Sequence, residues 1–433
     1  MRRTLFVVAV LLVCSGLIAF AAGGAEGSGA QKQTNIRFFS SLADRTSGLG
    51  LLEETMMSGY SKENPSVSFT VEALNDEAYK QKFQAYVASN SLPDCVGAYL
   101  SYIYAPAMKS GQLAELNPKD YANYDFFPGS FDNFSYNGKL YGLPYEVTTI
   151  FFYYNEGVFA ENGVKVPANY QELLDAVKAF KAKGVTPIAM NGKDMWSLGI
   201  LIQDIILKTT GARTAVYDAL DRKIKYATDP NIKKGIDYAK QLFDLKPFQD
   251  SFTAADYGAA KNLFMQGQTA MWYMGAWEMG SAGDTNIPED VRNNLRAIQI
   301  PPANAGKWTD VVSWGGGRCV ASKSKVKGEA IKFLNYMFKK ENWAKKGMEL
   351  GLVIPCQKFD SFLTGKEGVL QKQIVNMLIG ASSLSAPAFI DASTPEWKVD
   401  TMTASQSFAA GLMTPEQFLQ DLDKAADKAK AAK

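Results

Sequence analysis

The stretch 147–154 is rich in β-branched and aromatic residues and carries no charge, and this pattern predicts a strand that is buried on both faces. An Asn-Gly pair at 137–138 precedes the stretch, and such a pair accepts the positive φ angles of a two-residue hairpin turn. Apolar residues then recur at helical spacing over 170–183, with Asn169 and Glu172 placed as in a capping box. The pattern therefore predicts a hairpin, a buried strand and an amphipathic helix in succession.

A second region of alternating patterns lies near the N-terminus. The residues at 34–39 and 67–71 predict two strands, and the stretch 49–60 between them predicts a helix. A strand, a helix and a strand in this order form a βαβ unit, so the first sheet is predicted to be largely parallel. Ligand sites of open α/β sheets lie at the carboxyl ends of strands. Residues 40–45, which follow the first strand, are therefore a candidate wall of a binding site.

The rest of the chain continues to alternate between strand and helix patterns. Predicted strands cover 186–190, 270–273, 298–300 and 319–321, predicted helices cover 77–88, 231–245 and 328–339, and a final helix is predicted to begin at Thr414. The strand at 298–300 is expected to return the chain to its first part. Three glycines at 315–317 permit the close approach of a ligand or of another backbone.

Length and composition indicate an exported protein of two or three domains. The chain has 433 residues, of which 47% are apolar and 21% charged, and domains span roughly 100 to 200 residues. Residues 1–21 carry two arginines, a short apolar run and small residues at the end, as a signal peptide does, and 22–30 predict a flexible tether. Cys14 leaves open a lipid-modified N-terminus. No later run reaches the roughly 20 apolar residues of a bilayer span.

Charge and residue usage narrow the classes of function. Removal of 1–21 takes away two arginines and no acid, leaving 44 of the 46 basic residues against 44 acidic ones. Such a chain has no net positive charge with which to neutralise the phosphates of a nucleic acid, so we expect no nucleic-acid partner. The absence of His rules out His-ligated metals and Ser-His-Asp triads, and we expect no cofactor. Cys95, Cys319 and Cys356 lie among apolar residues, which favours buried thiols over a Cys319–Cys356 disulfide.

The order of these motifs resembles the family 1 solute-binding proteins of ABC importers, which include the maltose-binding-protein-like sugar receptors. The resemblance is carried by YGLP at 141–144, a strand ending in YYN at 153–155, F-x-x-G-x-x-A-M at 264–271 followed by G-A-W at 275–277, and the motifs at 351–355 and 412–417. It runs from residue 34 to 423. It implies an α/β, two-lobe periplasmic-binding-protein-like fold with several crossovers, of which 147–155 is one, and a ligand cleft between the lobes.

Within the implied fold, each lobe is assigned two segments of the chain. Lobe one takes 31–149 plus 296–345, lobe two takes 150–295 plus 346–425, and 426–433 form a C-terminal tail. The implied mechanism is hinge closure over a ligand, after which a membrane permease recognises the closed form. The expected partners are a small carbohydrate and the permease subunits of an ABC importer. The protein is expected to be a monomer in the periplasm or at the cell surface, with no catalytic residue.

The candidate site residues follow from the chemistry of sugars. Aromatic rings cover the C–H faces of sugar rings, and carboxylates, amides and guanidinium groups bind the hydroxyls at the edges. The candidates from the predicted strand ends and loops are Ser40, Ser41, Asp44, Tyr99, Tyr145, Glu146, Asp194, Trp196, Trp277, Glu278, Trp314 and Arg318. Each aromatic residue taken singly also fits a core position, so it is their concentration at strand ends that favours a carbohydrate pocket.

Two alternatives remain open from the sequence. Arg318 could hold a carboxylate or phosphate, which would make the ligand an acidic sugar, a sugar phosphate or an organic anion. Glu146 and Glu278 could instead serve as the acid and the nucleophile of a secreted glycosidase, because such enzymes use paired carboxylates.

Overall fold

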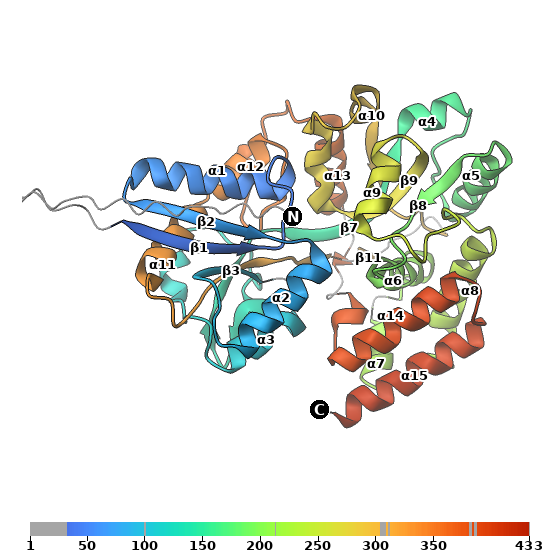
Figure 1. Ribbon diagram of the computed structural model, residues 1–433. Coiled ribbons are helices and arrows are strands. Elements are labelled where there is room, and N and C mark those ends of the chain that lie inside the picture. The colour runs from blue at the N-terminus through green and yellow to red at the C-terminus, as the bar shows by residue number, and fades with distance from the viewer. Residues whose placement is uncertain are drawn as a thin grey trace, which may run out of the picture.

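The structure is a computed structural model that describes residues 33–98, 101–212, 214–303, 309–310, 312–380, 383–384 and 388–432. The predicted signal peptide, the tether at 22–30, Cys14 and Tyr99 lie outside these ranges. The described residues form two lobes, each built on its own β-sheet (Figure 1).

The sheet of lobe one has five strands in the order β2-β1-β3-β13-β6. They are β1 (Thr34–Ser40), β2 (Val67–Ala73), β3 (Cys95–Ala98), β6 (Gly142–Pro144) and β13 (Gly317–Val320). β1 pairs in parallel with both β2 and β3, which confirms the predicted βαβ unit, whereas β13 is antiparallel to β3 and β6. α1 lies on one face of this sheet and α2 on the other (Figure 1).

The remaining elements of lobe one complete its core. They are α1 (Gly48–Glu63), α2 (Asp76–Ala88), α3 (Ser101–Lys109), η1 (Pro118–Tyr121), η2 (Asp132–Phe134), β4 (Ser135–Tyr136), β5 (Lys139–Leu140), α11 (Lys327–Met337) and α12 (Trp343–Glu349). β4 and β5 form the predicted hairpin, in which Asn137 and Gly138 have φ angles of 49° and 73°. Phe38, Leu52 and Phe333 are among the buried residues of the core between sheet and helices.

The second sheet has the order β10-β7-β9-β8, with β12 paired to the start of β7. Its strands are β7 (Val147–Asn155), β8 (Thr186–Ala189), β9 (Thr269–Gly275), β10 (Leu295–Ile298) and β12 (Val312–Trp314). Every residue of β7 except Thr148 is buried, because helices and loops cover both faces of the sheet. This confirms the predicted buried strand.

Helices surround the second sheet. They are α4 (Glu156–Glu161), α5 (Tyr170–Ala182), α6 (Trp196–Thr210), α7 (Ala215–Leu220), α8 (Pro230–Asp244), α9 (Tyr257–Met265), η3 (Ala276–Gly283), α10 (Glu289–Asn293), η4 (Asp360–Phe362), α13 (Val369–Gly380), η5 (Phe389–Asp391), α14 (Pro395–Ala409) and α15 (Pro415–Ala431), with the short strands β11 (Thr309–Asp310) and β14 (Ser383–Leu384). The caps predicted at Asn169 and Thr414 are present, each accepting a hydrogen bond from a backbone N–H three residues on.

Three segments of the chain pass between the lobes at one place. They lead from β6 into β7, from β12 into β13, and from α12 through residues 350–357. Backbone hydrogen bonds join them: Tyr145 N donates to Gly316 O (2.9 Å), Gly315 N donates to Glu146 O (2.9 Å) and Val147 N donates to Ile354 O (2.8 Å). Several crossovers therefore meet in one hydrogen-bonded junction.

The glycines at 315–317 lie close both to side chains and to another backbone: a Cβ at Gly317 would lie 2.4 Å from the backbone oxygen of Leu143. A Cβ at Gly315 would lie 2.5 Å from Cγ of Glu146, and one at Gly316 would lie 2.2 Å from the hydroxyl of Tyr145. Only glycine fits both positions while Tyr145 and Glu146 keep their places.

The packing corrects two of the predicted segment boundaries. Residues 295–298 form β10, which pairs with β7 and keeps the chain in lobe two beyond the predicted return at 296. Ile300 is also part of the lobe-two core. Conversely, Leu352 and Val353 pack into the lobe-one core, after the predicted switch at 346. In both cases the contacts are with segments far away in sequence, which local patterns do not report.

The predicted C-terminal tail at 426–433 is described up to residue 432, where it forms the end of α15. α15 continues to Ala431, and Ala425, Ala426 and Ala429 are buried in the lobe-two core. Their small side chains form a narrow apolar stripe among lysines, which lets the helix pack closely on its neighbours.

Cys95, Cys319 and Cys356 are buried free thiols, which confirms the prediction of thiols rather than a disulfide. In the described part of the chain, none of the helices has both the length and the apolar character needed to cross a membrane.

Candidate ligand-binding site

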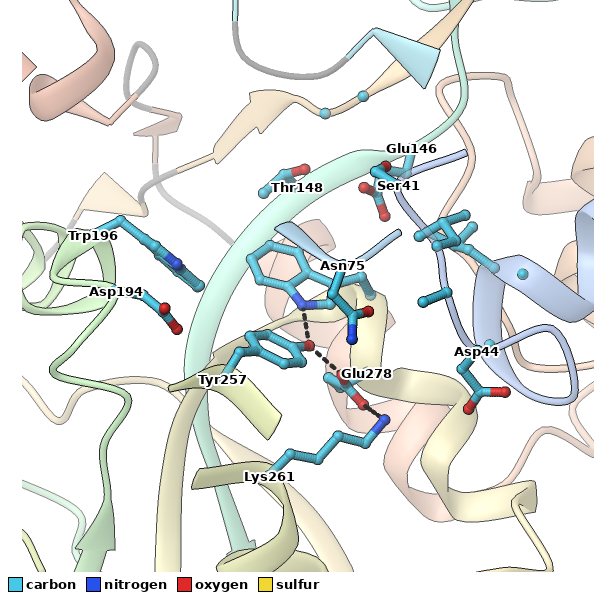
Figure 2. A pocket seen from close by; sticks show the side chains of 18 of the residues that line it. Ser41, Asp44, Asn75, Glu146, Thr148, Asp194, Trp196, Tyr257, Lys261 and Glu278 are labelled. Atoms are coloured by element: carbon cyan, nitrogen blue, oxygen red, sulfur yellow. Dashed lines mark hydrogen bonds and ion pairs between the residues drawn. The ribbon is translucent and has the colours of Figure 1, made fainter. Parts of the chain in front are cut away.

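A cavity of about 770 Å³ lies between the two lobes and is lined by residues from both. Lobe one contributes the loop after β1, and lobe two contributes the start of α6, the face of α9 and the turn after β9 (Figure 2). Of the predicted site residues, Ser41, Asp44, Tyr145, Glu146, Asp194, Trp196, Trp277 and Glu278 line it.

Two indole rings form the aromatic part of the cavity wall. Trp277 follows β9, and Trp196 is the first residue of α6. Their ring centroids are 6.0 Å apart with an interplanar angle of 55°. Trp277 also packs against core residues of both lobes, so its ring is held at the boundary between them.

A strained turn presents Trp196 to the cavity. Met195 has φ 62° and ψ −30°, and Trp196 N donates to Asp194 O across it at 2.7 Å. A non-glycine residue in this conformation costs about 1–3 kcal/mol and persists only where the surrounding structure holds it. The turn places the side chains of Asp194 and Trp196 on the same cavity wall (Figure 2).

The carboxyl group of Glu278 is the centre of a polar network beside Trp277. Lys261 Nζ lies 3.0 Å from Glu278 Oε2, Ser281 Oγ donates to the same oxygen at 2.9 Å, and the hydroxyl of Tyr257 donates to Oε1. Tyr257 in turn accepts a hydrogen bond from Trp277 Nε1 at 2.9 Å. Figure 2 shows this chain of contacts along one side of the cavity.

The surroundings raise the pKa of both Lys261 and Tyr257. Burial disfavours the charged form of Lys261, but the attraction of Glu278 outweighs it and raises the pKa of Lys261. Burial, and then the charge of Glu278, raise the pKa of Tyr257 well above its usual value. Tyr257 therefore stays protonated and donates to Glu278.

Asp44 shapes the lobe-one wall. Its Oδ1 accepts from Thr46 N at 2.8 Å, and its Oδ2 accepts from Ser47 Oγ at 2.6 Å. Partial burial opposes ionisation, but these hydrogen bonds from Ser47 and Thr46 outweigh it and lower the pKa of Asp44. The ionised side chain thus ties the loop to the start of α1.

The structure places Ser40 and Arg318 away from the cavity, which corrects those two predictions. Both side chains are fully buried in lobe one. Arg318 forms an ion pair with Glu53 of α1 and donates to Ser40 Oγ at 3.1 Å, while Ser40 Oγ donates to Glu53 Oε2 at 2.8 Å. The physical reason is that Glu53 supplies the charge partner that a buried guanidinium needs.

Two further predictions cannot be placed in the cavity. Tyr99 lies outside the described residues. Trp314 belongs to β12, where its backbone pairs with Val147, and only its backbone is described.

Several cavity residues were missed by sequence reasoning. They include Asn75, Thr148, Tyr257, Lys261, Asp391 and Lys398. Tyr257 and Lys261 are four residues apart on α9, just before the predicted F-x-x-G motif, so helical spacing could have placed them on one face. Asp391 and Lys398, whose side chains pair at 2.6 Å, carry no local signal. Among the described residues, no group of three or more acidic or cysteine side chains is placed to hold a metal ion.

Comparisons with known proteins agree with this geometry. The family model described as bacterial extracellular solute-binding protein matches residues 55–362. The multiple sugar-binding protein of Streptococcus mutans is 25% identical over 284 residues, which are 64% of this chain and 66% of that protein. An ABC transporter extracellular-binding protein of Pyrococcus horikoshii is 24% identical over 259 residues, or 58% of this chain and 57% of that protein. Each match thus spans less than two thirds of the relative's length.

Solved structures match over most of the chain. One comes from work on xylan utilisation by the thermophilic bacterium Caldanaerobius polysaccharolyticus, with a TM-score of 0.79, 26% identity, and coverage of 90% of this chain and 99% of that one. A chitin oligosaccharide binding protein has a TM-score of 0.77 and 24% identity, with coverage of 92% and 99%. These matches confirm the predicted periplasmic-binding-protein-like fold. Together with the family model, they place this chain in the family of bacterial extracellular solute-binding proteins, whose members are receptors rather than enzymes.

Proposed function

We propose that the protein is the extracytoplasmic receptor of an ABC importer and that it binds a neutral mono- or oligosaccharide between its lobes. The observation that carries this proposal is the placement of Trp196 and Trp277 beside the Glu278 network in one interlobe cavity. The indole faces suit the C–H patches of a sugar ring, and the adjacent carboxylate, hydroxyl and ammonium groups suit its hydroxyls.

The junction of three chain passages is the proposed hinge. A ligand first docks on one lobe, and the other lobe then closes over it about this junction. Closure requires that the ligand bind the closed form more tightly than the open form. Trp277, which packs against both lobes, is suited to contact the ligand in each state. The closed form is the one that the membrane permease would recognise.

A neutral ligand fits the cavity better than an anion. The acidic alternative rested on Arg318, which is buried and paired with Glu53. Of the lysines that line the cavity, Lys193, Lys261 and Lys398 are paired, at 3.8 Å with Asp256, at 3.0 Å with Glu278 and at 2.6 Å with Asp391. These cations are therefore already neutralised by the protein.

A thermal-shift panel tests the proposal. The panel contains glucose, galactose, raffinose, maltotriose, xylotriose and chitotriose, with glucuronate and glucose 6-phosphate as acidic members. A cognate sugar at 100 times its Kd stabilises the folded protein by about 2.7 kcal/mol, which raises the melting temperature by roughly 5 to 10 °C for a lobe of about 200 residues. No shift with any member at millimolar concentration would contradict the sugar-binding proposal, and a shift with an acidic member alone would favour the acidic alternative.

A pair of matched variants separates binding from stability. Trp196→Phe should weaken the sugar affinity, because Trp196 lines the cavity and its smaller replacement covers less of a sugar face. Trp397→Phe changes a fully buried tryptophan of the same lobe that does not line the cavity. It should lower the melting temperature and leave the affinity unchanged in isothermal titration calorimetry. Equal affinities in the two variants would count against the cavity as the site.

A further inference from the structure

Glu146 lies where the three interlobe passages meet. Its carbonyl oxygen accepts hydrogen bonds from Gly315 N at 2.9 Å and from Cys356 Sγ at 2.7 Å. Its side chain lines the cavity, where a Cβ on Gly315 would approach its Oε1 to 3.0 Å. Gly315 thus bonds to the backbone of Glu146 and, because it has no side chain, leaves space for the carboxyl group of Glu146 at the cavity wall (Figure 2).

The carboxyl group of Glu146 has no partner among the described residues. Its side chain is nearly buried, with the residue 7% exposed, and no hydrogen bond or ion pair to its carboxyl oxygens occurs in that part of the structure. Glu278, in the same cavity, has three partners. A buried carboxylate without a partner is costly, so such a group stays protonated instead.

The groups that face Glu146 do not supply a positive charge. They are Tyr145 from the same passage, Tyr153 from β7 and Cys356 from the third passage. Burial raises the pKa of each, so these three groups are uncharged at neutral pH. The glycines of the second passage carry no charge. Burial therefore raises the pKa of Glu146 to about 8, and the group is a neutral acid at pH 7.

We propose that Glu146 binds the ligand as a neutral carboxylic acid, whose O–H donates a hydrogen bond to an acceptor oxygen of an uncharged sugar. The inference rests on the proposed function and adds a specificity-determining contact to it. A neutral carboxylic acid can donate a hydrogen bond, whereas a carboxylate can only accept one. Loss of the proton removes the donor and leaves an unpaired negative charge against the ligand, so the affinity falls at alkaline pH.

Calorimetric titration across pH tests this inference. The probe is whichever of raffinose, xylotriose or chitotriose stabilises the protein most in the thermal-shift panel, titrated at pH 6, 7, 8 and 9. The affinity should be constant from pH 6 to 7 and about tenfold weaker at pH 9, because about a tenth of Glu146 stays protonated one unit above its pKa. Binding at pH 9 should also take up a proton, seen as a dependence of the heat on the ionisation enthalpy of the buffer.

Two variants assign the effect to Glu146. In Glu146→Gln the amide still donates through its NH2 group and cannot ionise, so the affinity should be the same at pH 7 and 9. The control Trp277→Phe should bind more weakly at every pH and keep the tenfold alkaline loss. An equal affinity at pH 7 and 9 in the unmodified protein, or an alkaline loss that persists in Glu146→Gln, would overturn the inference and leave the receptor function standing. Absence of binding at every pH would instead overturn the proposed function.

Discussion

Replacing Glu53 with Gln should destabilise lobe one strongly, although Glu53 does not line the cavity. Glu53 lies between two guanidinium groups: Arg318 contacts its Oε1 and Arg45 contacts its Oε2. The side chains of Arg318 and Glu53 are 0% exposed, and that of Arg45 is 18% exposed. Burial, and then repulsion by Arg45, lower the pKa of Arg318 to about 9. Glu53 is thus the acid that pairs with the buried charge of Arg318.

The free energy of unfolding should fall because Arg318 and Arg45 lose the carboxylate that lies between them. Breaking a buried ion pair costs about 3–5 kcal/mol, since the remaining charge has lost its partner and cannot reach water. For a lobe of about 200 residues, this loss lowers the melting temperature by roughly 6 to 20 °C. Replacing Glu53 and Arg318 together by Met should recover part of the loss, because the buried charge of Arg318 is then absent as well.

The adjacent residue provides a matched control. Glu54 forms an ion pair with the same Arg45, at 2.8 Å from its Nε, but its side chain is 41% exposed. Glu54→Gln should therefore cost at most about 1 kcal/mol, since water screens this pair. Thermal and urea unfolding of both variants, without ligand, checks the comparison. If Glu53→Gln and Glu54→Gln have the same melting temperature, the inference that the buried pair of Glu53 and Arg318 stabilises lobe one is wrong.

Two further predictions concern a close contact between the lobes and the side chain of Glu146. In Gly280→Ala the new Cβ would lie 2.9 Å from the backbone Cα of Gly48 in the other lobe. Overpacking of this kind costs about 1–3 kcal/mol. The variant should therefore have a lower melting temperature and, in small-angle scattering, a larger radius of gyration. Gly283→Ala, where no atom lies within 4 Å of the new Cβ, is the control, and identical behaviour of the two variants would contradict the contact. Glu146→Gln should stabilise the ligand-free protein increasingly as pH rises from 5 to 8, by about 1.4 kcal/mol per unit. The reason is that folded Glu146 keeps its proton up to pH about 8, whereas in the unfolded chain it loses the proton near the usual value of 4.5. The unmodified protein therefore loses stability across this window. If the unfolding free energies of the variant and the unmodified protein in urea differ by the same amount at pH 5 and pH 8, the prediction is wrong.

Elements with local signals were predictable from sequence. The hairpin turn at 137–138 needs φ angles that Asn and Gly tolerate, and both residues adopt them. The cap at Asn169 is a contact between residues three apart, so the chain carries both partners within one turn. β7 was recognisable because its uncharged residues suit a strand that is covered on both faces.

The candidate site was predictable in part. Asp44 and Trp277 were proposed because sites form at the carboxyl ends of strands, Glu146 was proposed from the loop before the predicted strand at 147–154, and all three line the cavity. Arg318 was proposed from the glycine-rich loop before the predicted strand at 319–321, yet its side chain lies in the lobe-one core, because Glu53 on α1 pairs with it there. Lys398 was missed because no sequence motif links it to its partner Asp391 or to the other residues of the cavity.

The sequence by itself determined the order and type of the elements, the caps and turns, and membership of a two-lobe receptor family. These rest on backbone propensity, hydrophobic spacing and contacts between near neighbours, all of which a linear pattern records. Only the tertiary structure decided where the chain changes lobes, which charged groups are neutralised by a partner, and that Glu146 stands alone in the cavity wall. Burial and charge pairing depend on segments that are distant in sequence and meet only in the folded protein.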